Sequence, residues 1–169
     1  MMHPRMEELL VNTLRPADSK IVTREVCAAR MGATPPDFRW VFTNGCFDLL
    51  HAGHVASLEA ARALGDGLVV GLNSDSSVRA LKGPTRPVIP QGDRAIVLAA
   101  LECVDLVVLF DELTPEAILG LLRPRVHAKG GDYVAEELPE YGLVRSWGGE
   151  VRILPILEGR STTSILARI

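Results

Sequence analysis

The stretch Thr43-Asn-Gly-Cys-Phe-Asp-Leu-Leu-His-Ala-Gly-His54 decides how the chain is interpreted, because it joins an expected strand to an expected helix. The strand covers residues 39–43, the helix covers residues 54–64, and two of the chain's four histidines stand at their junction. A helix amino terminus offers unpaired N–H groups and the positive end of a dipole, so an imidazole pair beside it makes a compact donor site for phosphate oxygens. Gly53 lets a phosphate approach the backbone, since no Cβ stands in the way.

The same junction has a plainer interpretation, a strand-to-helix turn in which one histidine caps the helix and the other is solvated. We favour a nucleotide-phosphate site because Thr43, Asn44 and Gly45 stand immediately upstream at the first β-to-α junction. His51 and His54 are therefore the first candidate functional residues.

Outward from this junction, short β-rich runs alternate with amphipathic segments of helix length. The runs 68–72 and 106–110 are continuously apolar, as expected for strands of a parallel sheet that is covered on both faces. Strands are expected at 39–43, 68–73, 105–110, 125–129 and 150–154, and helices at 54–64, 75–81, 92–101, 115–122 and 138–147. This series predicts an α/β fold, a single Rossmann-like, doubly wound parallel sheet of about five strands with flanking helices, whose ligands bind beyond the carboxyl ends of the strands.

Composition narrows the class of protein. The 169 residues are 47% hydrophobic, which is typical of one globular domain. Lys and Arg total 18 against 21 Asp and Glu, so the attraction expected of a general nucleic-acid binder is missing. The apolar runs are far shorter than the roughly 18 residues of a membrane span. The amino terminus resembles neither a signal peptide nor a transit sequence, so we expect a cytoplasmic protein that binds neither nucleic acid nor membranes.

The three cysteines are widely spaced and form no C-x-x-C pair, which argues against a disulfide framework and a cysteine zinc site. We assign no residue as a metal ligand. A dehydrogenase is also disfavoured, because no G-x-G-x-x-G follows the first strand.

Other segments of the chain also carry candidate residues. Lys82 lies before a stiff Gly-Pro turn in a chain with three lysines, and it is interpreted as a phosphate contact in place of a solvated side chain. Arg86 and Arg94 are candidate phosphate clamps, with a solvated role equally open. Lys129-Gly-Gly-Asp132 offers either backbone N–H groups to an anion or a simple Gly-Gly turn. Ser161-Thr-Thr163 leads an expected terminal helix, where it binds phosphate or only caps the helix.

These stretches together resemble a known family. The first contains the H-x-G-H signature of the nucleotidyltransferase superfamily. With Asn73-Ser-Asp75, 81–88, 129–133 and 159–163, it is similar to the adenylyltransferase domain of bacterial heptose phosphate enzymes over about residues 20–169. The resemblance implies transfer of AMP from ATP, with Mg²⁺, to D-glycero-β-D-manno-heptose 1-phosphate, giving ADP-heptose and pyrophosphate. Before residue 38 the sequence shows two weak helical patterns, one at residues 6–14 and one at residues 24–30 with Thr23 as its N-cap. We therefore expect an N-terminal helical extension over 1–37 and a nucleotidyltransferase domain over 38–169.

The resemblance carries site roles onto matching residues. The implied catalytic residues are His51, His54 and Lys82. The implied nucleotide-binding residues are Thr43, Asn44, Gly45, Cys46, Phe47, Gly53, Asn73, Asp75, Ser161, Thr162 and Thr163. The implied substrate-binding residues are Asp48, Arg86, Lys129, Gly130, Gly131 and Asp132. His127, on an expected buried strand, is interpreted as a core residue.

Two other functions stay open. Cytidylyl transfer to a small phosphorylated alcohol such as glycerol phosphate shares the first motif, but relatives that use CTP usually carry R-T-x-G-I-S-T-T where this chain has Glu158-Gly-Arg-Ser-Thr-Thr163. A non-catalytic nucleotide-binding module is disfavoured by the intact histidine pair. A covalent route through Cys46 is disfavoured because direct transfer needs no protein nucleophile.

The resemblance also bears on partners. Many members of the family are fused to a sugar kinase that these 169 residues are too few to contain, so we expect a separate heptose kinase. The resemblance is also compatible with a homodimer.

Overall fold

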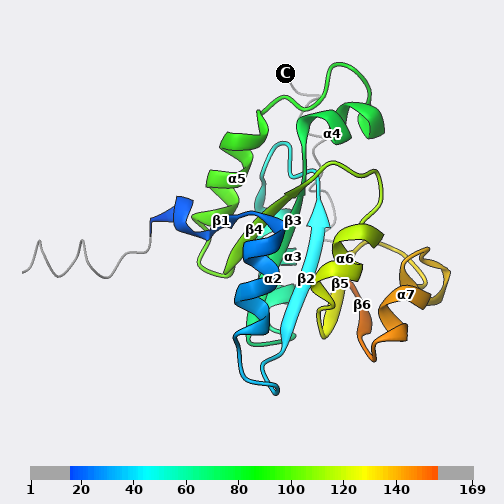
Figure 1. Ribbon diagram of the computed structural model, residues 1–169. Coiled ribbons are helices and arrows are strands. Elements are labelled where there is room, and N and C mark those ends of the chain that lie inside the picture. Colours follow the sequence, from blue (N-terminus) through cyan, green and yellow to red (C-terminus); the bar gives the residue numbers. More distant parts are fainter. Residues whose placement is uncertain (1–15, 156–169) are drawn as a thin grey trace, which may run out of the picture.

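The computed structural model describes residues 16–155, and its elements form one sheet with helices on both faces (Figure 1). The helical pattern at residues 6–14 and the terminal helix expected from Ser161 lie outside the described residues. No helix of the described part is long and apolar enough to cross a membrane.

The sheet has six strands in the order β1-β4-β3-β2-β5-β6, and every neighbouring pair is parallel. Its strands are β1 (Ile21–Val22), β2 (Trp40–Gly45), β3 (Gly67–Asn73), β4 (Leu106–Phe110), β5 (Val126–Gly130) and β6 (Glu150–Leu154). The sequence predicted about five strands, so β1 is a correction. Two residues are too short a run to show a strand period, and β1 exists because it pairs with Val107 and Val108 of β4.

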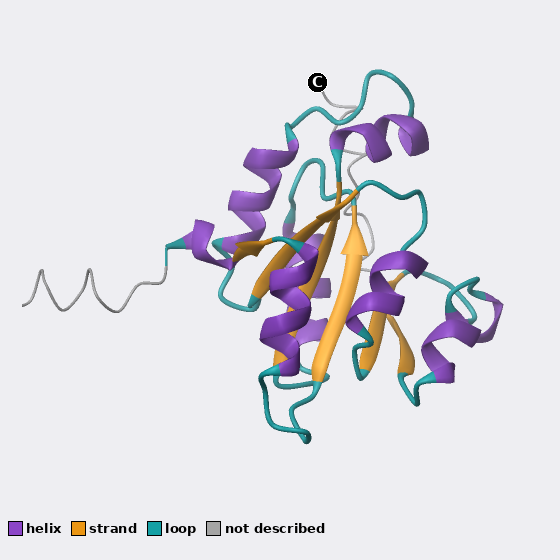
Figure 2. Cartoon of the chain, viewed as in Figure 1, coloured by secondary structure: helices purple, strands orange, loops and turns teal. Residues whose placement is uncertain are grey.

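Two helices cover one face of the sheet and three cover the other (Figure 2). The first face carries α3 (Ala52–Arg62) and α5 (Gln91–Ala99), and the second carries α2 (Arg24–Gly32), α6 (Glu116–Leu122) and α7 (Tyr141–Ser146). Helix α4 (Asp75–Lys82) follows β3 beyond the sheet, and two short 3-10 turns are η1 (Ala17–Lys20) and η2 (Ala135–Glu137). The segment expected as an N-terminal extension thus supplies η1, β1 and α2 to the same layers.

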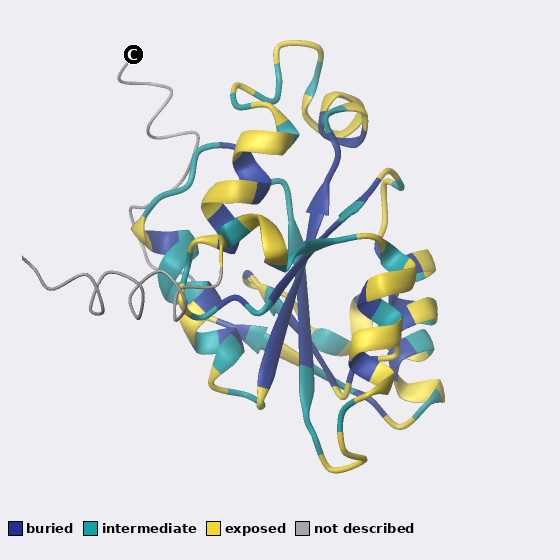
Figure 3. Ribbon diagram, turned by 60° about the vertical axis from the view of Figure 1, so that its left-hand side comes forward, coloured by how far each residue is buried: buried dark blue, intermediate teal, exposed yellow. Residues whose placement is uncertain are grey.

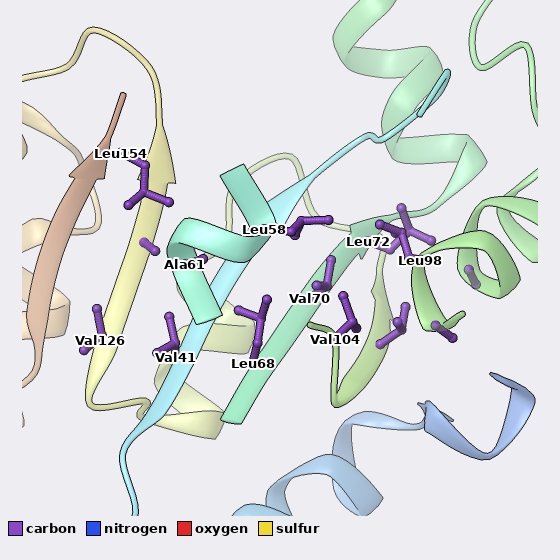
Figure 4. Packing of buried hydrophobic residues seen from close by; sticks show 14 residues of the cluster. Val41, Leu58, Ala61, Leu68, Val70, Leu72, Leu98, Val104, Val126 and Leu154 are labelled. Atoms are coloured by element: carbon purple, nitrogen blue, oxygen red, sulfur yellow. The ribbon is translucent and has the colours of Figure 1, made fainter. Parts of the chain in front are cut away.

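The core lies between these layers, and all seven residues of β3 are buried (Figure 3). On one face, Leu58 and Ala61 of α3 and Leu98 of α5 pack on the strands (Figure 4). Burying side chains of this size contributes about 1.5 to 3 kcal/mol each. The continuously apolar strands are therefore explained by cover on both faces.

The order of the strands reverses between β2 and β5. Their pairing runs from Val41↔Val126 to Phe42↔His127, whereas β2 continues to Gly45 and β5 to Gly130. Beyond that register the two strands part at their carboxyl ends. Ligands of doubly wound sheets bind at such a switch point, so the carboxyl ends of β2 and β5 are the expected place of the functional site.

Candidate active site

The two histidines of the first motif stack on each other at the start of α3. Their ring centroids lie 3.9 Å apart at an interplanar angle of 26°. The N–H of Gly53 donates to Nδ1 of His51 at 3.1 Å, and the N–H of His51 donates to Nδ1 of His54 at 3.4 Å. An Nδ1 that accepts a hydrogen bond carries no proton, so the neutral rings carry theirs on Nε2. The helix begins at Ala52, two residues before the expected start at His54, and its N-cap is His51.

The charge state of His54 follows from its surroundings. Burial, and after it the neighbouring His51, lower the pKa of His54 from 6.5 to about 4. His54 is therefore neutral near pH 7, and it acts as a hydrogen-bond donor through Nε2 without a full positive charge.

The turn between β2 and α3 depends on an unusual backbone. Phe47 has a φ of 44°, in the left-handed region that few side chains adopt. Its ring meets His54 edge-on at 5.3 Å, and a Cβ on Gly45 would lie 3.0 Å from that ring. Gly45 thus leaves room for the aromatic ring that packs against the histidine pair.

Arg94 of α5 is buried beneath this turn, at 2% exposure. Its Nη1 donates to the carbonyl of Cys46 at 2.5 Å and to that of Asn73 at 2.9 Å, while Nε donates to the carbonyl of Ile89 at 2.9 Å. Its Nη2 donates to Asp75 at 2.7 Å. Neither the phosphate clamp nor the solvated role expected from the sequence describes Arg94, which joins the ends of β2 and β3 to the loop before α5.

Two expected substrate-binding residues bind each other. Asp48, at 3% exposure, accepts from Nε of Arg86 and from the N–H groups of Val88 at 2.7 Å and Ile89 at 3.0 Å. Burial acts to raise the pKa of Asp48, but these hydrogen bonds outweigh it and lower the pKa overall. The pair fixes the loop that follows Lys82.

The end of β3 is held in a similar way. Nδ2 of Asn73 donates to Oγ of Ser77 at 2.9 Å, and Ser74 caps α4 by accepting from the N–H of Ser77. The N–H of Asp75 donates to Gln91 at 2.8 Å, and its carboxylate binds Arg94. The two residues expected to bind nucleotide, Asn73 and Asp75, thus position the start of α4.

The end of β2 contributes less constrained polar groups. Thr43 is 7% exposed, and Oδ1 of Asn44 is buried without a hydrogen-bond partner among the described residues. Burial raises the pKa of the Cys46 thiol, although the charge of Lys82 acts in the opposite direction. A thiol with a raised pKa is a poor nucleophile.

Lys82 lies exposed at the last position of α4, followed by Gly83 with a φ of 99°. Helix α4 follows β3, and β3 pairs with β2, whose end leads into the histidine turn. Lys82 and the histidine pair therefore lie on the same side of the switch point. This position is compatible with the phosphate contact expected from the sequence.

On the other side of the switch point, Lys129 binds a carboxylate that the sequence did not single out. Its Nζ donates to Oε1 of Glu140 at 2.6 Å, and Nε2 of His127 lies 3.2 Å from the same oxygen. Burial acts to raise the pKa of Glu140, but the hydrogen bonds from His127 and Lys129 bring it to about 2. His127 is buried, as interpreted, and no pattern in the sequence linked Glu140 to it.

The glycine turn after Lys129 differs from the expected anion cradle. Gly130 belongs to β5, and the N–H of Gly131 donates to the carbonyl of Leu154 at 3.2 Å, so that amide is engaged by β6. Asp132 is exposed. Ser161, Thr162 and Thr163 lie outside the described residues. Within residues 16–155 no cluster of three or more His, Cys, Asp or Glu side chains is arranged to hold a metal ion.

Comparisons with known proteins identify the family of the chain. The sequence model of the family described as cytidylyltransferase-like matches residues 42–168. The protein named bifunctional protein HldE is 51% identical over 92% of this chain in Trichlorobacter lovleyi and 62% identical over 76% in Streptomyces coelicolor. The chain spans 32% and 28% of those two relatives, about a third of their length.

Solved structures show the same architecture. A protein from Thermoplasma volcanium, described as a lipopolysaccharide core biosynthesis protein, matches with a TM-score of 0.59 at 28% identity, covering 73% of this chain and 99% of its own. A pantoate-beta-alanine ligase from Francisella tularensis shares the fold, with a TM-score of 0.56 at 12% identity, over 88% of this chain and 76% of its own. With the family match spanning the histidine pair, the chain belongs to the cytidylyltransferase-like family of nucleotidyltransferases.

Proposed function

We propose that the chain transfers the AMP part of ATP to a sugar 1-phosphate, D-glycero-β-D-manno-heptose 1-phosphate, and releases ADP-heptose and pyrophosphate. The similarity to HldE over most of the chain supports this choice of reaction. The observation that carries it is the stacked pair His51 and His54, whose Nδ1 atoms both accept backbone N–H groups and whose Nε2 atoms are therefore donors.

The reaction needs no covalent intermediate with the protein. An oxygen of the acceptor phosphate forms a bond to the α-phosphorus of ATP, and the bond from that phosphorus to the bridging oxygen of the β-phosphate breaks as pyrophosphate leaves. His51 and His54 stabilise the charge that develops on the phosphate oxygens, and Lys82 adds a positive charge on the same side. The frame built by Arg94 and Asp48 keeps these donors in place before the substrates bind.

Mg²⁺ enters this proposal with ATP as part of the substrate. It neutralises charge on the leaving pyrophosphate. The described residues contain no cluster of three or more ligands for a resident ion, so the triphosphate itself is proposed as the principal ligand. The proposed nucleotide-binding residues around β2 and α3 are Thr43, Gly45, Cys46, Phe47 and Gly53.

The same proposal covers localisation and oligomeric state. We place the reaction in the cytoplasm, and we do not assign a homodimer to the enzyme. A heptose kinase is proposed as the source of the acceptor, and the relatives of which this chain matches about a third are named bifunctional.

Cytidylyl transfer is the second candidate, because the family that matches this chain is described as cytidylyltransferase-like. The stretch Glu158-Gly-Arg-Ser-Thr-Thr163, which departs from the motif usual in CTP-using relatives, favours ATP. Pyrophosphate release measured for ATP, CTP and GTP, each with heptose 1-phosphate and with glycerol phosphate, tests both candidates. We expect the ATP and heptose 1-phosphate pair to be fastest. Equal or faster release with CTP would overturn the adenylyl assignment.

A further inference from the structure

The ammonium of Lys129 is paired with a buried carboxylate before any substrate arrives. Glu140 is 1% exposed, and its Oε1 lies 2.6 Å from Nζ of Lys129. Hydrogen bonds from His127 and Lys129 keep Glu140 ionised. The positive charge of Lys129 is therefore neutralised locally, which leaves the ammonium as a hydrogen-bond donor with little net attraction for an anion.

The charges of the segment around Lys129 also disfavour phosphate binding there. Between residues 129 and 140, Lys129 is the only cation, and the carboxylates are Asp132, Glu136, Glu137 and Glu140. The segment 76–92 on the other side of the switch point carries Arg79, Lys82 and Arg86 and no carboxylate. Arg86 is paired with the buried Asp48, so the exposed cations of this segment are Arg79 and Lys82. A phosphate is attracted to the second segment and repelled by the first.

An aromatic ring stands beside the paired ammonium. Nζ of Lys129 lies 5.7 Å from the ring centroid of Tyr133, and Tyr133 is 52% exposed. The ring folds back over Gly131, which has a φ of 146° and where a Cβ would lie 2.2 Å from the ring. The glycine turn thus places an exposed aromatic surface next to a charged donor and acceptor pair.

A further acceptor lies on the neighbouring strand. Asn44 and Lys129 are each two residues beyond the last paired residues, Phe42 and His127, so both project from the same face of the sheet where β2 and β5 part. The buried Oδ1 of Asn44 has no hydrogen-bond partner among the described residues. Buried acceptors are normally satisfied, so this oxygen is suited to a hydroxyl donor.

We propose that Lys129, Tyr133 and Asn44 form the subsite for the hydroxyl-bearing sugar of the acceptor, so that Asn44 contacts this sugar in place of the nucleotide expected from the sequence, and that Glu140 is the residue that positions Lys129 in it. The acceptor's phosphate then lies on the side of Lys82. An aromatic surface with an amide and a charged pair offers the apolar and polar contacts that a polyhydroxylated ring requires. The inference rests on the proposed function, because it assigns the two parts of a sugar phosphate to two sides of one site.

The test separates sugar recognition from phosphate recognition. Steady-state kinetics measure KM for heptose 1-phosphate and the inhibition constant of inorganic phosphate competing with that acceptor, for the wild type and Lys129→Met. We expect KM to rise about tenfold or more, because a hydrogen bond to a charged donor is lost, while kcat stays within a few-fold. The inhibition constant of phosphate stays unchanged. If it rises in parallel with KM, Lys129 holds the phosphate and the inference is wrong.

A second pair of variants addresses Glu140 and folding. Lys129→Met leaves the Glu140 carboxylate buried without its cation and with the hydrogen bond to His127 alone, whereas Lys129→Met/Glu140→Gln removes both charges. We expect the double variant to regain the thermal stability that Lys129→Met loses, with KM for heptose 1-phosphate still raised. Recovery of KM in the double variant would show that Lys129 only compensates charge, and it would overturn the subsite.

The positioning role of Glu140 has its own control. Glu140→Gln alone raises KM for the sugar phosphate and leaves KM for ATP unchanged, since a neutral amide holds the ammonium less firmly. Glu137→Gln, an exposed carboxylate of η2, leaves both unchanged. Equal effects of the two variants would overturn the role of Glu140. A wild type that releases no pyrophosphate with any sugar 1-phosphate would instead refute the proposed function.

Discussion

Arg94 and Asp75 form an ion pair across 2.7 Å, and this pair joins α5 to the first residue of α4. The same guanidinium donates to the carbonyl groups of Cys46 and Asn73 at the ends of β2 and β3. A planar group with five N–H donors suits several acceptors in different directions. The positions of Lys82 and of the histidine turn therefore depend on one buried residue, Arg94, whose hydrogen bonds go to other residues of the two strand ends and the adjoining segments.

Replacing Arg94 by Met is expected to lower the free energy of unfolding by about 3 to 5 kcal/mol, because it leaves a carboxylate and three carbonyl groups without their donor. Urea unfolding at neutral pH measures this loss. Arg79→Met, on an exposed position of α4, serves as the control and changes stability by about 0.5 kcal/mol or less. Comparable losses in the two variants would contradict the structural role of Arg94.

Asp48→Asn is expected to loosen the loop between α4 and α5. The amide keeps the size of the side chain but loses its charge and turns an NH₂ group toward donors, so stability falls by about 1.5 to 3 kcal/mol. Activity falls as well, since the loop follows Lys82. Urea unfolding and pyrophosphate release measure the two effects, with the exposed Asp37→Asn as the control. An Asp48→Asn protein as stable as Asp37→Asn would refute this account.

Much of the fold followed from the sequence, because apolar runs and helix-length segments alternate regularly from residue 39 onward. The exception is β1, whose Ile21 and Val22 form a strand only through pairing with β4. Because these partners are more than 80 positions apart in the sequence, the pairing produces no hydrophobic periodicity around residues 21–22 from which a strand could be predicted. Thr23, by contrast, was predicted as an N-cap from its local context, and its side chain accepts from the N–H of Val26.

The site was predictable in position and less so in detail. The H-x-G-H spacing placed His51 and His54 at a strand-to-helix junction, where the structure has them. The burial of Arg94 and the pairing of Asp48 with Arg86 depend on loops folding over each other, so the residue types alone suggested ligand contacts. Glu140 was missed for the same reason, since its partners lie on β5.

The stability of the protein is expected to depend on pH through His54. Its pKa is about 4 in the folded protein against 6.5 as the ordinary value, so the unfolded chain binds more protons between these two values. The contribution is fully present above pH 6.5 and is lost as the pH falls toward 4. Urea unfolding across this window should show a smaller loss for His54→Gln than for the wild type. Identical pH profiles of the two proteins would mean that folding does not lower the pKa of His54.

Lys82→Ala is expected to lower kcat and to change KM little. An ammonium that counters charge at the α-phosphate acts more strongly in the transition state than in the ground state. Arg79→Ala, on the same helix, removes a charge of equal sign and leaves kcat within a few-fold. Steady-state kinetics with circular dichroism as a folding check measure both. A rise in KM with an unchanged kcat would instead assign Lys82 to ground-state binding.

His51→Ala and His54→Ala are each expected to lower kcat by about 10² or more, because a donor aimed at developing charge is worth about 2.7 to 4 kcal/mol. Since His54 is neutral above pH 5 in the free protein, its contribution to kcat/KM should stay constant between pH 5.5 and 8. Cys46→Ser is the matched control from the same turn, and it keeps most of the activity because direct transfer needs no thiolate. Near-normal kcat in both histidine variants would refute the phosphate site. Loss of activity in a folded Cys46→Ser protein would instead support a covalent route, in which the thiolate displaces pyrophosphate from the α-phosphorus and an oxygen of the acceptor phosphate then displaces the thiolate.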